Sequence, residues 1–229
     1  MNYEVKSIDY QDCKEWFLKK HYAKRIPSIS FCFGLYSDKL EGVCSFGKPA
    51  SPNLCESICG VEYKELVYEL NRLVVNDGLP KNTLSYFVSK TLKLLPELII
   101  VSFADAYQGH HGYIYQATNW IYTGEGAGGT SWAVKGLEHL HHTSIEDSVG
   151  RYEDRSKEIP LEDLLRKKYG DKLYKKQESP KHRYFFFLGN NKDVKIMKEN
   201  LKYKILPYPK GDNKRYDASY KPQTQKILL

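Results

Sequence analysis

A strand–helix–strand pattern between residues 65 and 103 constrains the fold of this chain more than any other feature. The segment 65–75 (ELVYELNRLVV) is rich in branched and aromatic residues, which favour a β-strand. Apolar residues then recur with helical spacing over 84–95, and Pro96 ends that helix. A second apolar segment, 98–103, predicts another strand. Two strands joined by one helix predict a βαβ-like unit, and therefore a mixed sheet in an α/β fold.

Weaker patterns predict the remaining elements. Helical patterns cover 7–20, 160–169 and 193–200, and strand patterns cover 30–36, 40–46 and 184–188. The first two of these strands flank the short polar link 37–39, which predicts an antiparallel hairpin, and we expect a loop over 47–52. The chain is expected to divide into a core over 1–150, a basic elaboration with a closing strand over 151–206, and an extended or disordered tail over 207–229.

Length and composition limit the class of protein. A chain of 229 residues suits one large domain, or one domain with a substantial elaboration. No apolar run approaches the roughly 20 residues that span a bilayer, and the first residues lack the apolar core of a signal peptide. The five cysteines favour free thiols over a disulfide framework, because their number is odd. We therefore expect a cytoplasmic protein with no membrane partner, in the host cytoplasm if the protein is viral.

Basic and aromatic residues alternate in the C-terminal part of the chain. The formal net charge is +7, and Lys and Arg recur from Lys157 onward with tyrosines between them. Basic side chains bind phosphates and aromatic faces stack on exposed bases, so this mixture suits a nucleic-acid partner. A solvated basic surface that aids solubility explains the same charge, and charge alone does not separate the two readings.

Polar residues crowd into the segment that follows the strand 98–103. Asp105 and His110 lie there among glycines, and aromatic residues follow them. Because α/β enzymes place reactive side chains in loops at strand ends, an enzyme is the first hypothesis. Together with His21 and Tyr22, which lie far away in the sequence, these residues suit a carboxylate–imidazole metal site or an acid–base pair. Both alternatives are open at this point.

The helix predicted after residue 82 begins with donors that suit a phosphate. The first N–H groups of a helix lack intrahelical partners, and its dipole is positive at that end. The side chains that add donors there are Lys81, Asn82, Thr83 and Ser85. An ordinary helix cap by Asn82 or Thr83 explains the same residues.

Glu69 and Arg72 place two charges inside a predicted strand. Their separation of three residues puts them on opposite faces of the sheet. Buried charges are costly unless they are paired, so each of the two needs a partner or lines a cleft. A structural ion pair and a functional role are both open.

Taken in order, the motifs resemble those of the Mom family of phage DNA-modification proteins, which are divergent members of the GNAT-type acyl-CoA N-acyltransferase fold. The matching segments are 21–22 (HY), 25–27 (RIP), 46–51 (FGKPAS), 69–73 (ELNRL), 80–85 (PKNTLS), 102–105 (SFAD), 109–110 (GH), 115–120 (YQATNW), 124 (G) and 182–184 (HRY). Each is weak alone, but their order and number make the match specific.

The resemblance implies an α/β (α+β) fold with a GNAT-like mixed, mostly antiparallel central sheet flanked by helices. It implies a transferase that modifies the exocyclic amine of adenine in DNA with a carbamoylmethyl-type group, which protects phage DNA from host restriction. The cofactors that it implies are acetyl-CoA or another acyl-CoA, as the small-molecule acyl donor, and iron. DNA is the implied partner, and a homodimer is a further expectation.

The resemblance also implies roles for particular residues. The catalytic residues would be Asp105, His21, Tyr22 and Ser51. The pyrophosphate of an acyl-CoA would be held by Arg72, Lys81, Asn82, Thr83 and Ser85. The iron ligands would be His21, Tyr22 and Asp105. Contacts with DNA would come from Lys24, Arg25, Lys48, Gln116, Asn119, Trp120, His182 and Arg183.

One departure and two alternatives accompany these expectations. The usual GNAT pyrophosphate loop is Gly-rich, whereas this chain has Pro80 to Thr83 there, so the position of the cradle is better supported than its occupancy by coenzyme A. The first alternative is a GNAT-fold acyl or aminoacyl transferase that acts on another base, a hypermodified base or a small amine. The second is a non-catalytic nucleic-acid-binding protein that keeps the fold.

Overall fold

The computed structural model describes residues 2–21, 23–106, 109–150 and 159–211. These residues form two compact units. The smaller unit consists of residues from 127 to 180, and the larger unit contains the residues before and after that segment. The sequence-based boundary at residue 150 therefore differs from the structure, because the chain leaves the main sheet near residue 126 and returns to it at residue 181.

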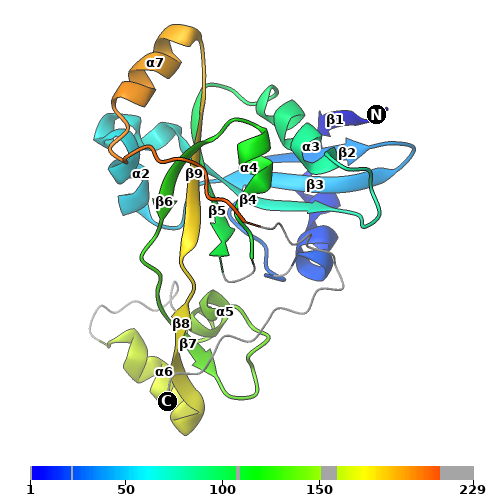
Figure 1. The fold of residues 1–229 in the computed structure, drawn as a ribbon. Helices are drawn as coiled ribbons and strands as arrows, with labels where there is room; N and C mark the ends of the chain where they lie inside the picture. Colours follow the sequence, from blue (N-terminus) through cyan, green and yellow to red (C-terminus); the bar gives the residue numbers. More distant parts are fainter. Residues whose placement is uncertain (1, 22, 107–108, 151–158, 212–229) are drawn as a thin grey trace. The chain divides into compact units, whose positions relative to one another are not determined.

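The larger unit is built on a seven-stranded sheet with the strand order β1-β2-β3-β4-β5-β9-β6 (Figure 1). Its strands are β1 (Glu4–Ser7), β2 (Phe31–Tyr36), β3 (Leu40–Gly47), β4 (Val67–Val75), β5 (Leu98–Asp105), β6 (Ile121–Glu125) and β9 (Lys181–Leu188). All neighbouring strands run antiparallel except β4 and β5, which run parallel. The predicted hairpin, the predicted βαβ-like unit and the predicted fold class, a mixed and mostly antiparallel sheet with helices, are confirmed.

Helical elements cover both faces of this sheet. They are α1 (Tyr10–Glu15), the π-helical turn η1 (Trp16–Lys20), α2 (Pro52–Cys59), the 3-10 turn η2 (Val61–Leu66), α3 (Thr83–Leu92), α4 (Tyr113–Ala117) and α7 (Asn191–Glu199). None of the helices in the described part of the chain combines the length and the hydropathy needed to cross a membrane.

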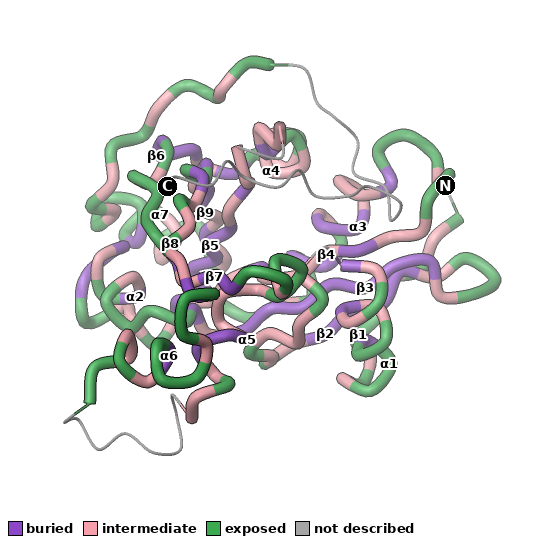
Figure 2. The backbone as a smooth tube through the Cα atoms, turned by 90° about the horizontal axis from the view of Figure 1, so that it is seen from below, coloured by how far each residue is buried: buried purple, intermediate pink, exposed green. Residues whose placement is uncertain are grey.

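The apolar run of β5 explains why both faces need cover. Ile100 packs in one cluster with Phe87 of α3, whereas its neighbour Val101 packs in another with Ile58 of α2 and Met197 of α7. Successive residues of a strand point to opposite faces, so a strand buried on both sides has a continuous apolar sequence. Figure 2 shows the buried segments of the larger unit along the central strands.

Two helices begin where local capping residues allow them. The segment 47–52 was expected to be a loop, but Ser51 caps α2 by accepting from the Leu54 N–H at 3.3 Å, and Pro52 occupies the first turn. A Ser–Pro pair is a good helix start, because Pro needs no N–H partner there. The helix expected from residue 7 begins at Tyr10 after the cap Asp9, because β1 occupies the chain up to Ser7.

The smaller unit has a sheet of two antiparallel strands that packs with two helices. Its elements are β7 (Gly129–Val134), α5 (His142–Asp147), α6 (Leu161–Tyr169), the 3-10 turn η4 (Gly170–Lys172) and β8 (Leu173–Glu178). Val134, Ile145, Leu165 and Leu173 form its core. The predicted helix at 160–169 is confirmed, and the two strands of this unit were not predicted.

The chain crosses the larger unit once more after α7, as a segment that we call the C-terminal strap (residues 200–211). The Lys202 N–H donates to the Ile58 carbonyl at 2.9 Å, and the Leu206 N–H donates to the Tyr122 carbonyl at 2.9 Å. The Tyr208 hydroxyl donates to the Trp120 carbonyl at 2.6 Å. In Figure 1 the strap passes from α7 across β6 toward α4. The predicted tail over 207–229 is thus packed on the unit through residue 211, and 212–229 lie outside the described residues.

Candidate functional site

The two parallel strands of the sheet stop pairing before either of them ends. Their register runs from Val67 with Ile99 to Glu69 with Val101, although β4 continues to Val75. Beyond that point β4 remains paired with β3, and β5 remains paired with β9. Ligands of open α/β sheets bind outside the carboxyl ends of parallel strands. The point where β4 and β5 part is therefore the first place to look for a site.

Hydroxyl groups meet at this point. Ser102 on β5 donates to the Leu70 carbonyl of β4 at 2.9 Å, and the Tyr115 hydroxyl of α4 lies 2.7 Å from Ser102 Oγ. A serine hydroxyl has one proton, so at any one time Ser102 donates it either to the Leu70 carbonyl or to the Tyr115 hydroxyl, which accepts. The phenol of Tyr115 is thus aimed from α4 at the parting strands.

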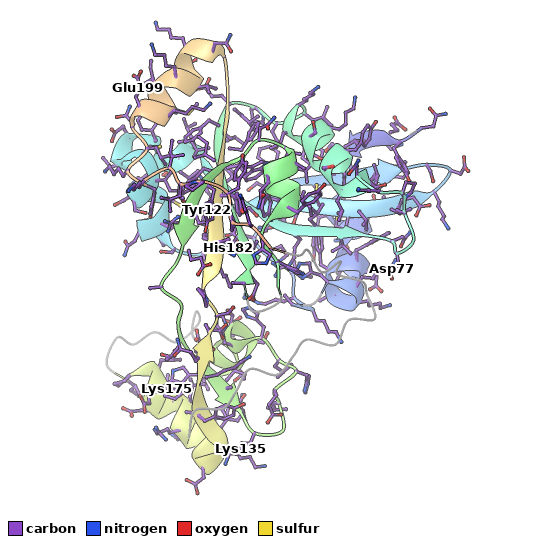
Figure 3. All side chains as sticks on the ribbon, viewed as in Figure 1. Asp77, Tyr122, Lys135, Lys175, His182 and Glu199 are labelled. Atoms are coloured by element: carbon purple, nitrogen blue, oxygen red, sulfur yellow. The ribbon has the colours of Figure 1, made fainter. Side chains whose placement is uncertain are left out.

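Histidine and tyrosine side chains continue from Tyr115 along β6 and β9. The Tyr122 hydroxyl lies 2.9 Å from His182 Nδ1, and Glu125 Oε1 lies 3.3 Å from the same nitrogen (Figure 3). His182 is 3% exposed, and burial lowers its pKa although Glu125 acts in the opposite direction. Burial also raises the pKa of Tyr184 to about 12, and its hydroxyl donates to the His111 carbonyl at 2.5 Å. His182, Tyr122 and Tyr184 are therefore neutral hydrogen-bonding groups near pH 7, since burial also raises the pKa of Tyr122.

The start of α3 has the features of a phosphate site and one difference from the expectation. Asn82 precedes the helix with a φ of 70° and makes no side-chain cap. The hydroxyls of Thr83 and Ser85 donate to the carbonyls of Pro80 (2.7 Å) and Asn82 (3.0 Å). Two of the four predicted phosphate donors thus bond the backbone, while the exposed Lys81 remains beside the positive end of the helix dipole.

Arg72 connects β4 to the segment that contains His21. Its Nε and one terminal nitrogen lie 3.3 Å from the Arg25 carbonyl, and the other terminal nitrogen donates to the Asn71 carbonyl at 2.6 Å. His21 is buried, and its Nδ1 accepts from the Ala23 N–H at 3.1 Å. Arg72 therefore anchors the loop after η1 to the central sheet.

Glu69 lies at the last residue pair before β4 and β5 part. It faces Gly47 across one side of β4 and Val101 across the other. Burial raises its pKa above the ordinary value, and the charges of Arg72 and Lys181 reduce that effect. The site therefore contains a carboxyl group that is partly removed from water, and the positive charges of Arg72 and Lys181 offset only part of the cost of ionising it.

This environment predicts how stability depends on pH. A carboxyl with a raised pKa binds more protons in the folded than in the unfolded protein, so the free energy of unfolding falls as pH rises from about 4.3 to the raised value. Glu69→Gln should remove this fall, and the variant should be more stable relative to wild type at pH 8 than at pH 4. Urea unfolding at several pH values measures this, with the exposed Glu62→Gln as the control. Parallel pH profiles for wild type and Glu69→Gln would contradict the assignment.

A model of the Mom protein family matches residues 2–210. The chain belongs to the Mom protein family. Among curated proteins, the methylcarbamoylase Mom of Escherichia phage Mu is 32% identical over 112 residues, which are 46% of this chain and 46% of that protein. The matched part therefore spans about half the length of the phage Mu protein.

Two solved acetyltransferases show a more distant likeness to this Mom-family chain. One, from Bacillus subtilis in complex with CoA, is 12% identical with a TM-score of 0.37, covering 82% of this chain and 100% of that chain. The other, a ribosomal-protein-S5-alanine acetyltransferase from Vibrio fischeri, is 10% identical with a TM-score of 0.43, covering 82% of this chain and 93% of that chain. The fold class of the present chain rests on its own strand order.

Two residues expected to contact DNA have other surroundings in this Mom-family chain. Trp120 is fully buried against Tyr115 and Phe186, so it presents no face to a base. His182 is buried against Tyr122 rather than positioned for a phosphate. The sequence does not distinguish these cases, because an aromatic or imidazole ring that faces a site and one that is buried beneath it occur at similar positions in the sequence.

Of the other residues predicted to contact DNA, some are exposed and others make hydrogen bonds within the protein. Lys24 and Asn119 are exposed and have positive φ values of 42° and 61°. Gln116 Nε2 donates to the His111 carbonyl at 2.8 Å, which holds the start of α4. Arg183 bonds Thr123 Oγ1 at 3.0 Å. The Arg25 carbonyl is the acceptor of Arg72, as described above.

Ser51 and Lys48 have structural contacts in this region. Ser51, expected to be catalytic, is the N-cap of α2. Lys48 donates to the Glu65 carbonyl at 2.5 Å and lies 4.4 Å from the centroid of the Tyr68 ring. These contacts give both residues a structural role in the segment between β3 and β4, and a role toward a substrate stays a prediction.

The predicted iron ligands do not form a recognisable metal site. Within residues 2–21, 23–106, 109–150 and 159–211, no three His, Cys, Asp or Glu side chains gather so that they could hold a metal ion. Tyr22 lies outside the described residues, and His21 Nδ1 is occupied by the Ala23 N–H. The described residues therefore give no support to the predicted iron site, which stays a prediction, and no chemical step is assigned to iron.

Asp105 keeps the position that the sequence predicted for it. It is the last residue of β5, opposite Lys181 of β9, and its carbonyl accepts from the His110 N–H at 3.2 Å. Burial lowers the pKa of His110, and the charge of Asp105 raises it. Ser102 and Asp105 thus both lie on the part of β5 beyond its pairing with β4, on opposite faces of the strand, with Tyr115 of α4 bonded to Ser102 and His110 close to Asp105. Ser102 and Tyr115 belonged to the matched motifs, but the sequence alone carried no signal that assigned them a role.

Proposed function

We propose that this protein transfers a carbamoylmethyl-type group to the exocyclic amine of adenine in DNA. The observation that carries the proposal is the Mom family match over residues 2–210, to which the likeness to the phage Mu methylcarbamoylase adds support. Encoded by a phage, such an enzyme would act in the host cytoplasm and protect phage DNA from restriction. The rest of the proposal concerns the residues that would hold the donor and the base.

An acyl-CoA fits part of the predicted cradle. It would supply a two-carbon acyl unit on a thiol leaving group, and the amide nitrogen of the carbamoylmethyl group, which an acyl-CoA does not contain, would come from a separate nitrogen donor. Lys81 and the first turn of α3 would bind its phosphates, because that turn has a positive dipole end and no side-chain cap. Arg72 would contribute by holding the loop around Arg25 rather than by contacting the donor directly, since its guanidinium bonds backbone carbonyls.

Three side chains are positioned to manage protons near the parting strands. The exocyclic amine must lose one proton when its nitrogen forms a new bond, and Asp105 at the end of β5 would accept it. Tyr115, held by Ser102, would donate a proton to a departing group. Glu69 would hold a proton to a higher pH than an ordinary carboxyl, because burial raises its pKa.

Nucleoside analysis tests the proposed function directly. DNA from bacterial cells that express the protein should contain a modified deoxyadenosine, identified by mass spectrometry after enzymatic digestion. A modified pyrimidine or a modified hypermodified base instead of deoxyadenosine would favour a transferase with another acceptor. DNA that is bound tightly but contains no modified nucleoside would favour the non-catalytic nucleic-acid-binding alternative. Cells that carry the empty vector provide the background for each comparison.

A further inference from the structure

The excess positive charge of the protein lies in its last part. Residues 1–126 contain 13 Lys and Arg against 14 Asp and Glu, and residues 127–180 contain 10 of each. Residues 181–229 contain 12 against 4, an excess of eight that accounts for the net charge of +7. The basic stretch expected from residue 157 carries 7 Lys and Arg against 5 Asp and Glu up to residue 180, so most of its excess charge follows residue 180, and a nucleic-acid partner should be sought at the surface formed by those later residues.

Six lysines form an exposed row on α7 and the C-terminal strap, which we call the lysine ridge. They are Lys192, Lys195, Lys198, Lys202, Lys204 and Lys210, and all six are exposed. The two acidic residues of α7 and the strap each interact with a neighbouring side chain. Glu199, labelled in Figure 3, lies 3.9 Å from Lys195, and Asp193 accepts from the side chain of Asn190. Six positive charges against two negative ones leave a net charge of +4 on this short segment.

The ridge has a fixed backbone. Met197 of α7 is buried in the core, and the strap is bonded to α2 and β6 through the N–H groups of Lys202 and Leu206. Lysines on a fixed backbone lose less conformational entropy on binding than lysines on a disordered segment. At about 1.5 Å per helical residue and about 3.3 Å per extended residue, the chain from Lys192 to Lys210 is at most about 47 Å long, enough to follow one turn of B-form DNA, which is about 34 Å.

The strap also leads toward the candidate site. The Tyr208 hydroxyl donates to the Trp120 carbonyl, and Gln116 Nε2 lies 3.4 Å from the Pro209 carbonyl. Gln116 is the neighbour of Tyr115 on α4, whose hydroxyl bonds Ser102 where the strands part. A polyanion that lies along the strap therefore ends beside the element that carries Tyr115.

We propose that the lysine ridge binds the phosphate backbone of duplex DNA and leads the duplex to the candidate site. This inference rests on the proposed function, from which it takes DNA as the substrate. Its own basis is the location of the charge, the rigidity of the strap and the continuity of the strap with α4. Phosphate contacts of this kind position a duplex without reading its sequence. Base recognition is therefore assigned to residues other than the ridge.

The test neutralises three ridge lysines and compares them with three lysines elsewhere. The ridge variant is Lys198→Gln, Lys202→Gln and Lys204→Gln together, and the matched control is Lys39→Gln, Lys90→Gln and Lys93→Gln. All six positions are exposed, so both variants should fold. Binding to a random-sequence duplex is measured at several salt concentrations. The slope of log K against log salt is negative, and each lost phosphate contact reduces its magnitude by about 0.9. The magnitude of the slope should therefore fall by about 2.7 in the ridge variant and stay unchanged in the control.

The outcomes separate this inference from the proposed function. Loss of affinity and slope in the ridge variant alone supports the ridge. Equal binding by the ridge variant and wild type, or equal losses in the ridge and control variants, would overturn it even if wild type modifies adenine. Tighter binding of an equally long RNA duplex or of anionic lipid vesicles through the same lysines would also overturn it. A wild-type protein that binds through the ridge but leaves adenine unmodified would refute the proposed function and leave the ridge standing.

Discussion

Replacing Trp120 with alanine is expected to destabilise the larger unit by about 3–5 kcal/mol, the usual cost of truncating a fully buried tryptophan. The ring is 0% exposed and lies 5.0 Å from the Tyr115 ring and 5.6 Å from the Phe186 ring. Truncation leaves a large cavity beneath α4, which the surrounding strands can fill only in part. Urea unfolding followed by tryptophan fluorescence or circular dichroism measures the loss.

The matched control is Tyr113→Ala, which truncates an aromatic ring of the neighbouring helix α4. Tyr113 is 49% exposed. Its effect should stay within about 0.5 kcal/mol. If Trp120 were a platform for a flipped base, Trp120→Ala would remain as stable as wild type and lose only binding of adenine-containing DNA. That result would show that the core position of the ring does not represent the protein in solution.

Replacing Asp105 with asparagine is expected to lower the rate of adenine modification at least about 100-fold, the usual contribution of a general acid–base group. The substitution keeps the shape of the side chain and removes the negative charge at the end of β5. It should also lower the pKa of His110 further, because the Asp105 charge raises that pKa against the effect of burial. Nucleoside mass spectrometry measures the first effect, and NMR titration of the histidines measures the second.

Asp38→Asn provides the control, since Asp38 is exposed in the turn between β2 and β3. It should change neither the modification rate nor the pKa of His110. Wild-type activity in a folded Asp105→Asn protein would refute the proton-accepting role of Asp105. A lowered pKa of His110 in that same protein would show that the two residues interact without serving the reaction.

The elements with strong periodic patterns were predictable from the sequence. The parallel unit of β4, α3 and β5 appeared in the pattern of residues 65–103, and the hairpin of β2 and β3 appeared in its two apolar runs. The short elements β6, β7 and α4 were not predicted, because five or six residues carry too little periodicity. The helix α2 was missed although Ser51 and Pro52 are a recognisable start, since the preceding Gly and Pro residues favoured a loop.

The sequence predicted the position of the candidate site better than the residues that form it. Asp105 and the start of α3 follow strand ends, and strand ends are visible in a sequence. The bond between Ser102 and Leu70, the burial of Glu69 and the pairing of Tyr122 with His182 depend on contacts between strands far apart in the chain. Such contacts follow from strand order, and nothing in the sequence indicated that β9 lies between β5 and β6.

That strand order has a consequence for the time at which the protein becomes able to act during its synthesis. β6 is complete at residue 125, but its partner β9 begins at residue 181, so β6 must wait for more than fifty residues to be translated. His182 and Tyr184 arrive with β9, and the strap that holds α4 follows them. Long-range pairing of this kind slows folding. The nascent chain therefore completes its main sheet last, and a fragment that ends before residue 181 lacks β9 and, with it, His182 and Tyr184.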